Sequence, residues 1–208
     1  MLQTRNLSFA YAGGALLRFP DLDCAAGEQW LLLGSSGSGK TTMLHLLAGL
    51  RKPKQGEVRI GKTVLTKLTG KALDQFRGQR IGLVFQQPHF LRALTVGENL
   101  ALARQMAGLP ADPAAIRQKL ERLNIGSKLH AYPHELSVGE RQRAAVARAL
   151  INEPSILLAD EPTSALDDEN ATQVIALLRE QATQAGATLL IVTHDTRLKT
   201  VFDQQIEL

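Results

Sequence analysis

Short apolar runs, separated by turns rich in glycine and proline, divide the chain into a series of predicted strands. Residues 1–33 alternate such runs with turn signals, which predicts short antiparallel strands. Runs in which nearly every residue is apolar predict strands that are buried on both faces. They cover residues 29–33, 81–86, 155–159 and 187–193, with a shorter strand at 57–60 and a last one near 206–208.

Helical patterns fill the stretches between these strands. Asp112 and Pro113 supply a capping carboxylate followed by proline at the first helical position, which is typical of a helix start. Further helices are predicted at 43–48, 139–152 and 168–185, the last ending at Gly186, and the whole stretch 87–152 is helical in pattern. Strands that alternate with helices predict an α/β fold with a mostly parallel central sheet and helices on both of its faces.

Residues 34–41 read Gly-Ser-Ser-Gly-Ser-Gly-Lys-Thr, which fits the phosphate-binding loop G-x-x-x-x-G-K-[ST] at every fixed position. The glycines let successive backbone N–H groups point into one concavity, and the following helix adds its positive end. A flexible Gly/Ser linker is the alternative, but linkers are not flanked by a buried strand and a helix. We therefore predict nucleoside triphosphate binding by Gly34, Ser35, Ser36, Gly37, Ser38, Gly39, Lys40, Thr41 and Thr42.

A second motif supplies two carboxylates. Asp160 and Glu161 follow the apolar residues 156–159, which places them at the carboxyl end of a buried strand, where ligands bind in open α/β sheets. Asp160 can hold Mg²⁺ together with Thr41, while Glu161 can orient or deprotonate an attacking water. An ordinary acidic junction between a strand and a loop is the bland alternative. The phosphate-binding loop upstream favours the catalytic interpretation.

The composition of the chain limits the kinds of binding partner and cellular compartment that we expect. The 208 residues carry a formal net charge of +4 with scattered basic residues, so a stripe for nucleic acid is not predicted. Cys24 is the single cysteine, which is typical of a reducing compartment. The N-terminus lacks a signal-like segment, and no apolar run approaches the roughly 18 residues that span a bilayer. We expect a cytosolic chain whose membrane role, if it has one, goes through a partner.

Leu136-Ser137-Val138-Gly139-Glu140, followed by Arg141-Gln142-Arg143, resembles the signature of ATP-binding-cassette (ABC) ATPase subunits, usually Leu-Ser-Gly-Gly-Gln. The resemblance covers essentially the whole chain. It implies a P-loop NTPase fold of the ABC type: one domain over 1–208, with an antiparallel β subdomain and a helical subdomain at about 87–152. It also implies a head-to-tail homodimer in which Ser137 and Gly139 close on the ATP of the opposing copy. Val138 and Glu140 depart from the usual residues.

Other residues of this resemblance occur in the expected order. Gln86 is similar to the glutamine that touches Mg²⁺ and senses the membrane partner, and His194 to the histidine that contacts the γ-phosphate. Residues 164–167, Ser-Ala-Leu-Asp, match the loop across the dimer seam. Tyr11 matches the aromatic that stacks on adenine, with Phe9 as the competing candidate. The resemblance thus implies catalysis by Glu161, His194, Lys40 and Gln86, metal binding by Thr41, Gln86 and Asp160, and nucleotide binding that adds Tyr11, Ser137 and Gly139 to the loop residues.

The implied function is that of an ATP-binding subunit of an ABC transporter. Such a subunit hydrolyses Mg·ATP as a homodimer to power a separate membrane permease, and lies on the cytoplasmic face of the inner membrane. Residues 132–137 and 157–162 look most like the lipoprotein-releasing and macrolide-exporter group, although amino-acid and metal importers share much of this pattern. The substrate and the direction of transport therefore stay open. The segment 87–99, with Phe90 and Leu91, is expected to help form a groove for a short permease helix.

Two other classes are disfavoured. ABC ATPases that act on DNA or the ribosome carry long insertions or two cassettes in one chain, and this chain has neither. A small-molecule phosphate-loop kinase needs a lid that binds the phosphate acceptor, and the signature segment at 136–140 argues against it.

Overall fold

A five-stranded parallel sheet forms the centre of the fold in a computed structural model that describes residues 1–164 and 166–208. The strand order is β10-β4-β9-β8-β7, and every pair is parallel. The predicted parallel sheet is thereby confirmed. The strands are β4 (Gln29–Leu33), β7 (Ile81–Val84), β8 (Ile156–Asp160), β9 (Thr188–Thr193) and β10 (Gln204–Glu207).

A second, antiparallel sheet is built around the N-terminal strand, which pairs with three others. Its members are β1 (Leu2–Phe9), β2 (Leu17–Arg18), β3 (Asp23–Cys24), β5 (Gln55–Ile60) and β6 (Thr63–Val64). Antiparallel pairing was predicted for all of residues 1–33. It is right for β1 to β3 and wrong for β4, whose leucines are buried on both faces and which therefore belongs in the central sheet.

Six α-helices accompany the sheets within the described residues: α1 (Lys40–Leu47), α2 (Gly70–Arg80), α3 (Val96–Met106), α4 (Pro113–Arg122), α5 (Val138–Leu150) and α6 (Asp168–Gln184). Side chains of Thr95, Asp112, Ser137 and Asp167 cap the last four of them. The sequence analysis missed α2, which has no fully buried residue and so lacks the apolar stripe that marks a helix. Among residues 1–164 and 166–208, the structure contains no helix that is long and apolar enough to cross a bilayer.

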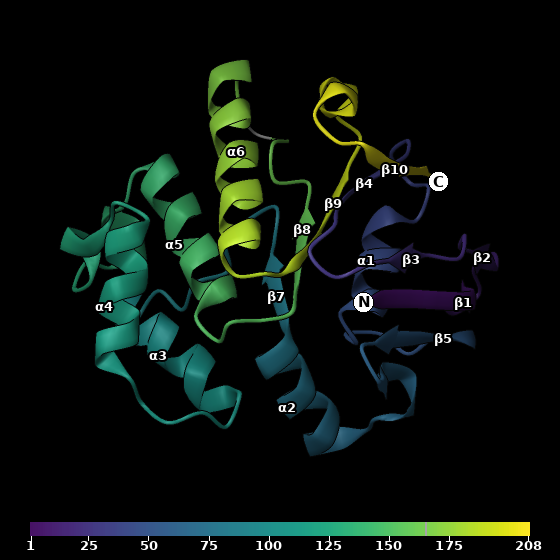
Figure 1. Cartoon of the computed structure of the whole chain (residues 1–208), viewed down its shortest axis with the longest axis horizontal. Helices are drawn as coiled ribbons and strands as arrows, with labels where there is room; N and C mark the ends of the chain where they lie inside the picture. The colour runs from purple at the N-terminus through teal and green to yellow at the C-terminus, as the bar shows by residue number, and fades with distance from the viewer. Residues whose placement is uncertain (165) are drawn as a thin grey trace.

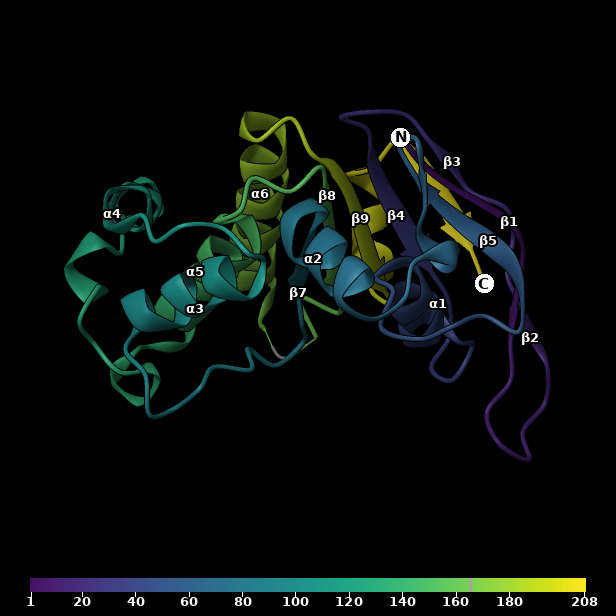
Figure 2. The same ribbon diagram turned by 90° about the horizontal axis from the view of Figure 1, so that it is seen from below.

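Helices α3 to α6 and the antiparallel sheet lie at opposite ends of the molecule, with the central sheet between them and α1 on the side of the antiparallel sheet (Figures 1 and 2). The side chains of the central strands point alternately into two hydrophobic cores, one on each face of the sheet. Leu31, Leu157 and Ile191 pack with α3 to α6, whereas Leu32 and Leu158 pack with α1 and the antiparallel sheet. Strands β4, β8 and β9 are therefore covered on both faces, which fixes where their carboxyl ends emerge, whereas the edge strand β10 is largely exposed.

A close approach between β7 and α5 depends on a glycine. A Cβ atom on Gly82 would lie 2.5 Å from the backbone oxygen of Ala149 and 3.0 Å from Cγ of Pro154. A backbone oxygen cannot move aside as the end of a flexible side chain can. The absence of a side chain at Gly82 therefore lets α5 pack closely against β7, the edge strand that precedes Gln86.

We expect Gly82→Ala to lower the free energy of unfolding by about 1–3 kcal/mol, because it overpacks this contact. Urea denaturation followed by circular dichroism measures the change. Gly14→Ala is the matched control, since its Cβ meets only an ordinary contact of 3.4 Å to Tyr11 Cβ; it should stay within about 0.5 kcal/mol. Equal stability of the two variants would contradict the close packing of β7 on α5.

Candidate functional site

The predicted phosphate-binding loop connects β4 to α1, as the sequence analysis expected. Gly37 and Gly39 adopt left-handed φ angles of 83° and 100°, which only glycine adopts at little cost. A Cβ on Gly34 would lie 2.6 Å from Ser38 Oγ, so the loop closes tightly on itself. No side chain caps the N-terminus of α1 and no acidic residue lies in its first turn. The open N–H groups of this turn can therefore receive an anion.

Lys40, the first residue of α1, is held by the loop itself. Its Nζ donates hydrogen bonds of 2.8 Å to the backbone oxygens of Gly34 and Ser35. It also lies 3.7 Å from Oε1 of Glu161. The side chain is only 6 % exposed, so its charge acts in a partly desolvated place where electrostatic interactions are stronger than in water.

Asp160 ends β8 beside the loop. Thr41 Oγ1 donates a hydrogen bond of 3.2 Å to its Oδ1. Burial raises the pKa of Asp160 above its ordinary value, with the hydrogen bond from Thr41 acting in the opposite direction. This hydroxyl and carboxylate lie side by side and are the kind of oxygen ligand that Mg²⁺ prefers. Thr41 and Gln86 line one cavity, whereas Asp160 is not among its described lining residues.

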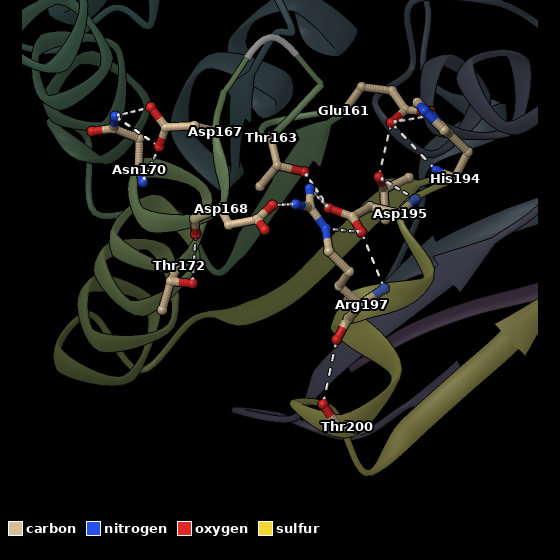
Figure 3. A network of polar contacts seen from close by, with 11 residues as sticks. Glu161, Thr163, Asp167, Asp168, Asn170, Thr172, His194, Asp195, Arg197 and Thr200 are labelled. Carbon is tan, nitrogen blue, oxygen red and sulfur yellow. Dashed lines mark hydrogen bonds and ion pairs between the residues drawn. The ribbon is translucent and has the colours of Figure 1, made fainter.

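Glu161 begins the loop after β8 in an unusual backbone conformation, with φ of 46°. Its N–H donates to the backbone oxygen of Val192 at 2.8 Å, which ties this turn to β9. Its carboxylate accepts a hydrogen bond of 2.8 Å from Thr193 Oγ1 and contacts His194 Nδ1 at 2.9 Å (Figure 3). Burial pushes the pKa of Glu161 upward, but the hydrogen bonds from His194 and Thr193 outweigh it and keep the pKa below its ordinary value.

These residues surround one cavity of about 540 Å³. Most of the predicted site residues line it: Tyr11, Ser36, Gly37, Gly39, Lys40, Thr41, Thr42, Gln86, Glu161 and His194. Gly14, Ala15 and Leu17 also line it, and the sequence analysis did not predict them. The only sequence feature close to these three residues is the Gly13-Gly14 pair, which indicates a turn. Gly34, Ser35 and Ser38 shape the loop behind the lining rather than the wall itself.

Tyr11, rather than Phe9, reaches the cavity. Its hydroxyl is 2.9 Å from Thr42 Oγ1. Phe9 meets the Tyr11 ring edge-on with centroids 4.9 Å apart, and the Arg51 guanidinium lies 5.0 Å from the Tyr11 centroid. Phe9 and Arg51 thus support the Tyr11 ring from outside the cavity.

Gln86 lies two residues beyond β7, because the strand ends at Val84 and not at the predicted residue 86. Its Nε2 donates a hydrogen bond of 2.9 Å to Ser164 Oγ. The loop predicted for the dimer seam therefore contacts the predicted glutamine. Within that motif, Ala165 lies outside the described residues.

Ser137 and Gly139 lie at the start of α5 and do not belong to the described lining of the cavity. Ser137 Oγ accepts a hydrogen bond from the Glu140 N–H at 3.3 Å, and the Glu140 carboxylate accepts one from the Ser137 N–H at 2.9 Å. Glu140 is also 3.2 Å from Lys128 Nζ. The departure at position 140 therefore closes a capping box, while Val138 is 68 % exposed.

The chain is similar to known proteins over its whole length. Residues 17–164 match the family described as ABC transporter. The lipoprotein-releasing system ATP-binding proteins LolD of Shewanella frigidimarina and Hydrogenovibrio crunogenus are each 40 % identical to the chain, over 99 % and 100 % of it and over 89 % and 93 % of their own lengths. A dimeric post-hydrolysis structure of the ATP-binding cassette MJ0796 bound to ADP and Pi is 32 % identical, with a TM-score of 0.87 over 100 % of this chain and 94 % of that one.

The raised pKa of Asp160 yields a prediction about stability. A carboxyl group whose pKa is raised by folding binds its proton more tightly in the folded chain. Its ionisation therefore destabilises the folded state as the pH rises through that pKa. We expect Asp160→Asn to raise Tm at pH 7 in the absence of nucleotide, because the amide carries no charge into this buried position.

The difference should shrink as the pH falls toward the ordinary value of 3.8, where the wild-type carboxyl is protonated as well. Calorimetry from pH 7 to pH 4 measures it, with Asp203→Asn at an exposed position as the control. A lower Tm for Asp160→Asn at pH 7 would contradict the desolvated carboxylate.

Proposed function

The chain belongs to the ABC transporter ATP-binding family and is an ATPase of that family, and on this premise we propose that its cavity hydrolyses Mg·ATP as one half of a homodimer that drives a membrane permease. One observation carries the proposal. The loop lysine, Thr41 and the Glu161–His194 pair line one cavity at the carboxyl ends of β4, β8 and β9, and Thr41 is hydrogen-bonded to Asp160 at the end of β8. That arrangement has a place for phosphates, a place for a cation and a carboxylate beside both.

Phosphoryl transfer needs charge stabilisation and positioning more than covalent chemistry. Lys40 and the N–H groups of the loop would hold the β- and γ-phosphates. Thr41, Asp160 and Gln86 would hold Mg²⁺, which neutralises phosphate charge when bound. Tyr11 would stack on the base, supported by its contacts to Phe9 and Arg51.

Glu161 would act on the attacking water. Its lowered pKa keeps it ionised, and the contacts from Thr193 and His194 fix the carboxylate in one orientation. A carboxylate of low pKa is a weak base, so orientation of the water is the larger part of this role. His194 would steady the γ-phosphate from the same side.

A second copy would complete the site through Ser137 and Gly139. Two solved structures of one relative, MJ0796, are described as dimeric. Ser137 and Gly139 lie at the N-terminus of α5, the end at which the helix dipole favours an anion. We propose the single domain 1–208 as the protomer, with 87–152 as its helical part.

The permease would dock beside the helical part, on the cytoplasmic face of the inner membrane. Asn99 is 4 % exposed and pins the loop before α3 through hydrogen bonds with Leu91, Leu94 and Thr95. Leu91 is nevertheless 53 % exposed on this hydrogen-bonded loop, and a cavity of about 240 Å³ is lined by His89 and Arg148. Such a surface suits a short amphipathic helix. The names of the LolD relatives favour a lipoprotein-releasing type of system. The scattered basic residues of the chain give no reason to propose a nucleic-acid partner.

Glu161→Gln should bind ATP but hydrolyse it at least about 10²-fold more slowly, because the carboxylate that orients the water is lost. Phosphate release measures turnover, and size-exclusion chromatography with Mg·ATP should show the variant as a dimer. Glu180→Gln on the exposed face of α6 is the control and should behave as wild type. Near-normal turnover of Glu161→Gln would contradict the assignment.

Leu91→Asp should reduce the share of the tagged chain that sediments with membranes of its source cells, because a charge replaces the apolar contact. Met106→Asp is the matched control, since Met106 is 74 % exposed at the end of α3. ATPase activity of both purified variants should stay at the wild-type level. If the two variants sediment equally with membranes, Leu91 does not form the docking surface.

A further inference from the structure

A continuous line of polar contacts runs from Glu161 away from the cavity (Figure 3). Thr193 Oγ1 donates to Glu161 Oε2 at 2.8 Å and accepts from the N–H of Asp195 at 3.1 Å. The Asp195 side chain is only 10 % exposed. Thr163 Oγ1 donates to it at 3.3 Å, so the segment after β8 and the segment after β9 share this carboxylate.

Arg197 extends the line to a different element. Its Nε and Nη2 donate to the two carboxylate oxygens of Asp195 at 2.8 and 2.6 Å, as a two-pronged fork. Its Nη1 donates to the carboxylate of Asp168, the first residue of α6. One guanidinium therefore joins the segment that carries His194 to the helix that begins directly after residues 164–167.

Stability alone does not account for this arrangement. The side chains of Arg197 and Asp168 are 49 % and 88 % exposed, and exposed ion pairs contribute about 0–1 kcal/mol. The buried Asp195, in contrast, already has Thr163 and the N-terminus of the following 3-10 turn to orient it. What Arg197 adds is a connection between two elements.

We propose that Arg197 is a positioning residue that couples the Glu161–His194 pair to the start of α6, and so to the loop expected at the seam between two copies. The inference rests on the proposed function, because it assigns a role in the same hydrolytic site. Movement of α6 at the seam would reach Asp195, Thr193 and Glu161 through this guanidinium. Lysine cannot replace it fully, since an ammonium lacks the planar fork that holds one carboxylate with two bonds while contacting another.

Arg197 is not part of the described lining of the nucleotide-sized cavity. Its removal should therefore affect turnover more than nucleotide binding. In the full-length chain we expect Arg197→Ala to lower kcat roughly tenfold, with KM for ATP and Tm nearly unchanged. Arg197→Lys should recover part of the loss. Asp168→Asn should act in the same direction, and the double variant Arg197→Ala/Asp168→Asn should be no slower than Arg197→Ala alone, because both break one connection.

Lys199→Ala is the matched control. Lys199 lies in the same 3-10 turn and pairs with Glu207 at 2.6 Å, outside this line of contacts. It should keep the wild-type kcat. A wild-type kcat for Arg197→Ala, or a loss matched by a lower Tm and a smaller fraction of chains that bind nucleotide, would overturn the proposal.

Amide hydrogen exchange of the nucleotide-free chain tests the coupling without activity. Arg197→Ala should speed exchange both in 193–198 and in 166–172, a segment that includes the first turn of α6. Faster exchange in 193–198 alone would overturn the coupling. A wild type that hydrolyses no ATP would count against the proposed function, and the exchange measurement would still decide the role of Arg197.

Discussion

Parallel pairing of β4, β9 and β8 is the constraint on which the rest of the site depends. In a parallel sheet all carboxyl ends lie at one edge, so the three loops that follow these strands are forced together. One loop contributes the lysine and the open N–H groups of α1, another contributes the two acidic residues, and the third contributes Thr193 and His194. The connection between β1 and β2 adds Tyr11, and helices α3 to α6 add no wall to this cavity within the described residues.

The strands and the motifs that follow them could be predicted from the sequence because their signals are local. An apolar run followed by a glycine-rich loop fixes the phosphate site, and a run ending in two acids fixes Asp160 and Glu161. Helix α2 escaped prediction because its residues are only partly buried and carry no apolar period. The end of β7 was predicted two residues too late. The predicted strand included Phe85 and Gln86, but the strand ends at Val84.

Contacts between distant segments could not be predicted from the sequence. Nothing in the spacing of Gln86 and Ser164, or of Asp168 and Arg197, shows that these side chains meet, because the meeting depends on how loops fold over the sheet edge. Glu140 is an instructive case. The spacing Ser137-x-x-Glu140 already fits the local pattern of a capping box, whereas the ion pair between Glu140 and Lys128 is a contact that only the structure shows.

The left-handed backbone at Glu161 has a consequence for laboratory evolution. A glutamate at φ of 46° costs folding free energy that glycine or asparagine would not, and the surrounding structure maintains it. A library selected for expression or thermal resistance alone would therefore favour replacements at this position that remove the carboxylate. Stability and turnover compete at this residue, and a screen for more robust variants must reward hydrolysis in every round to keep it.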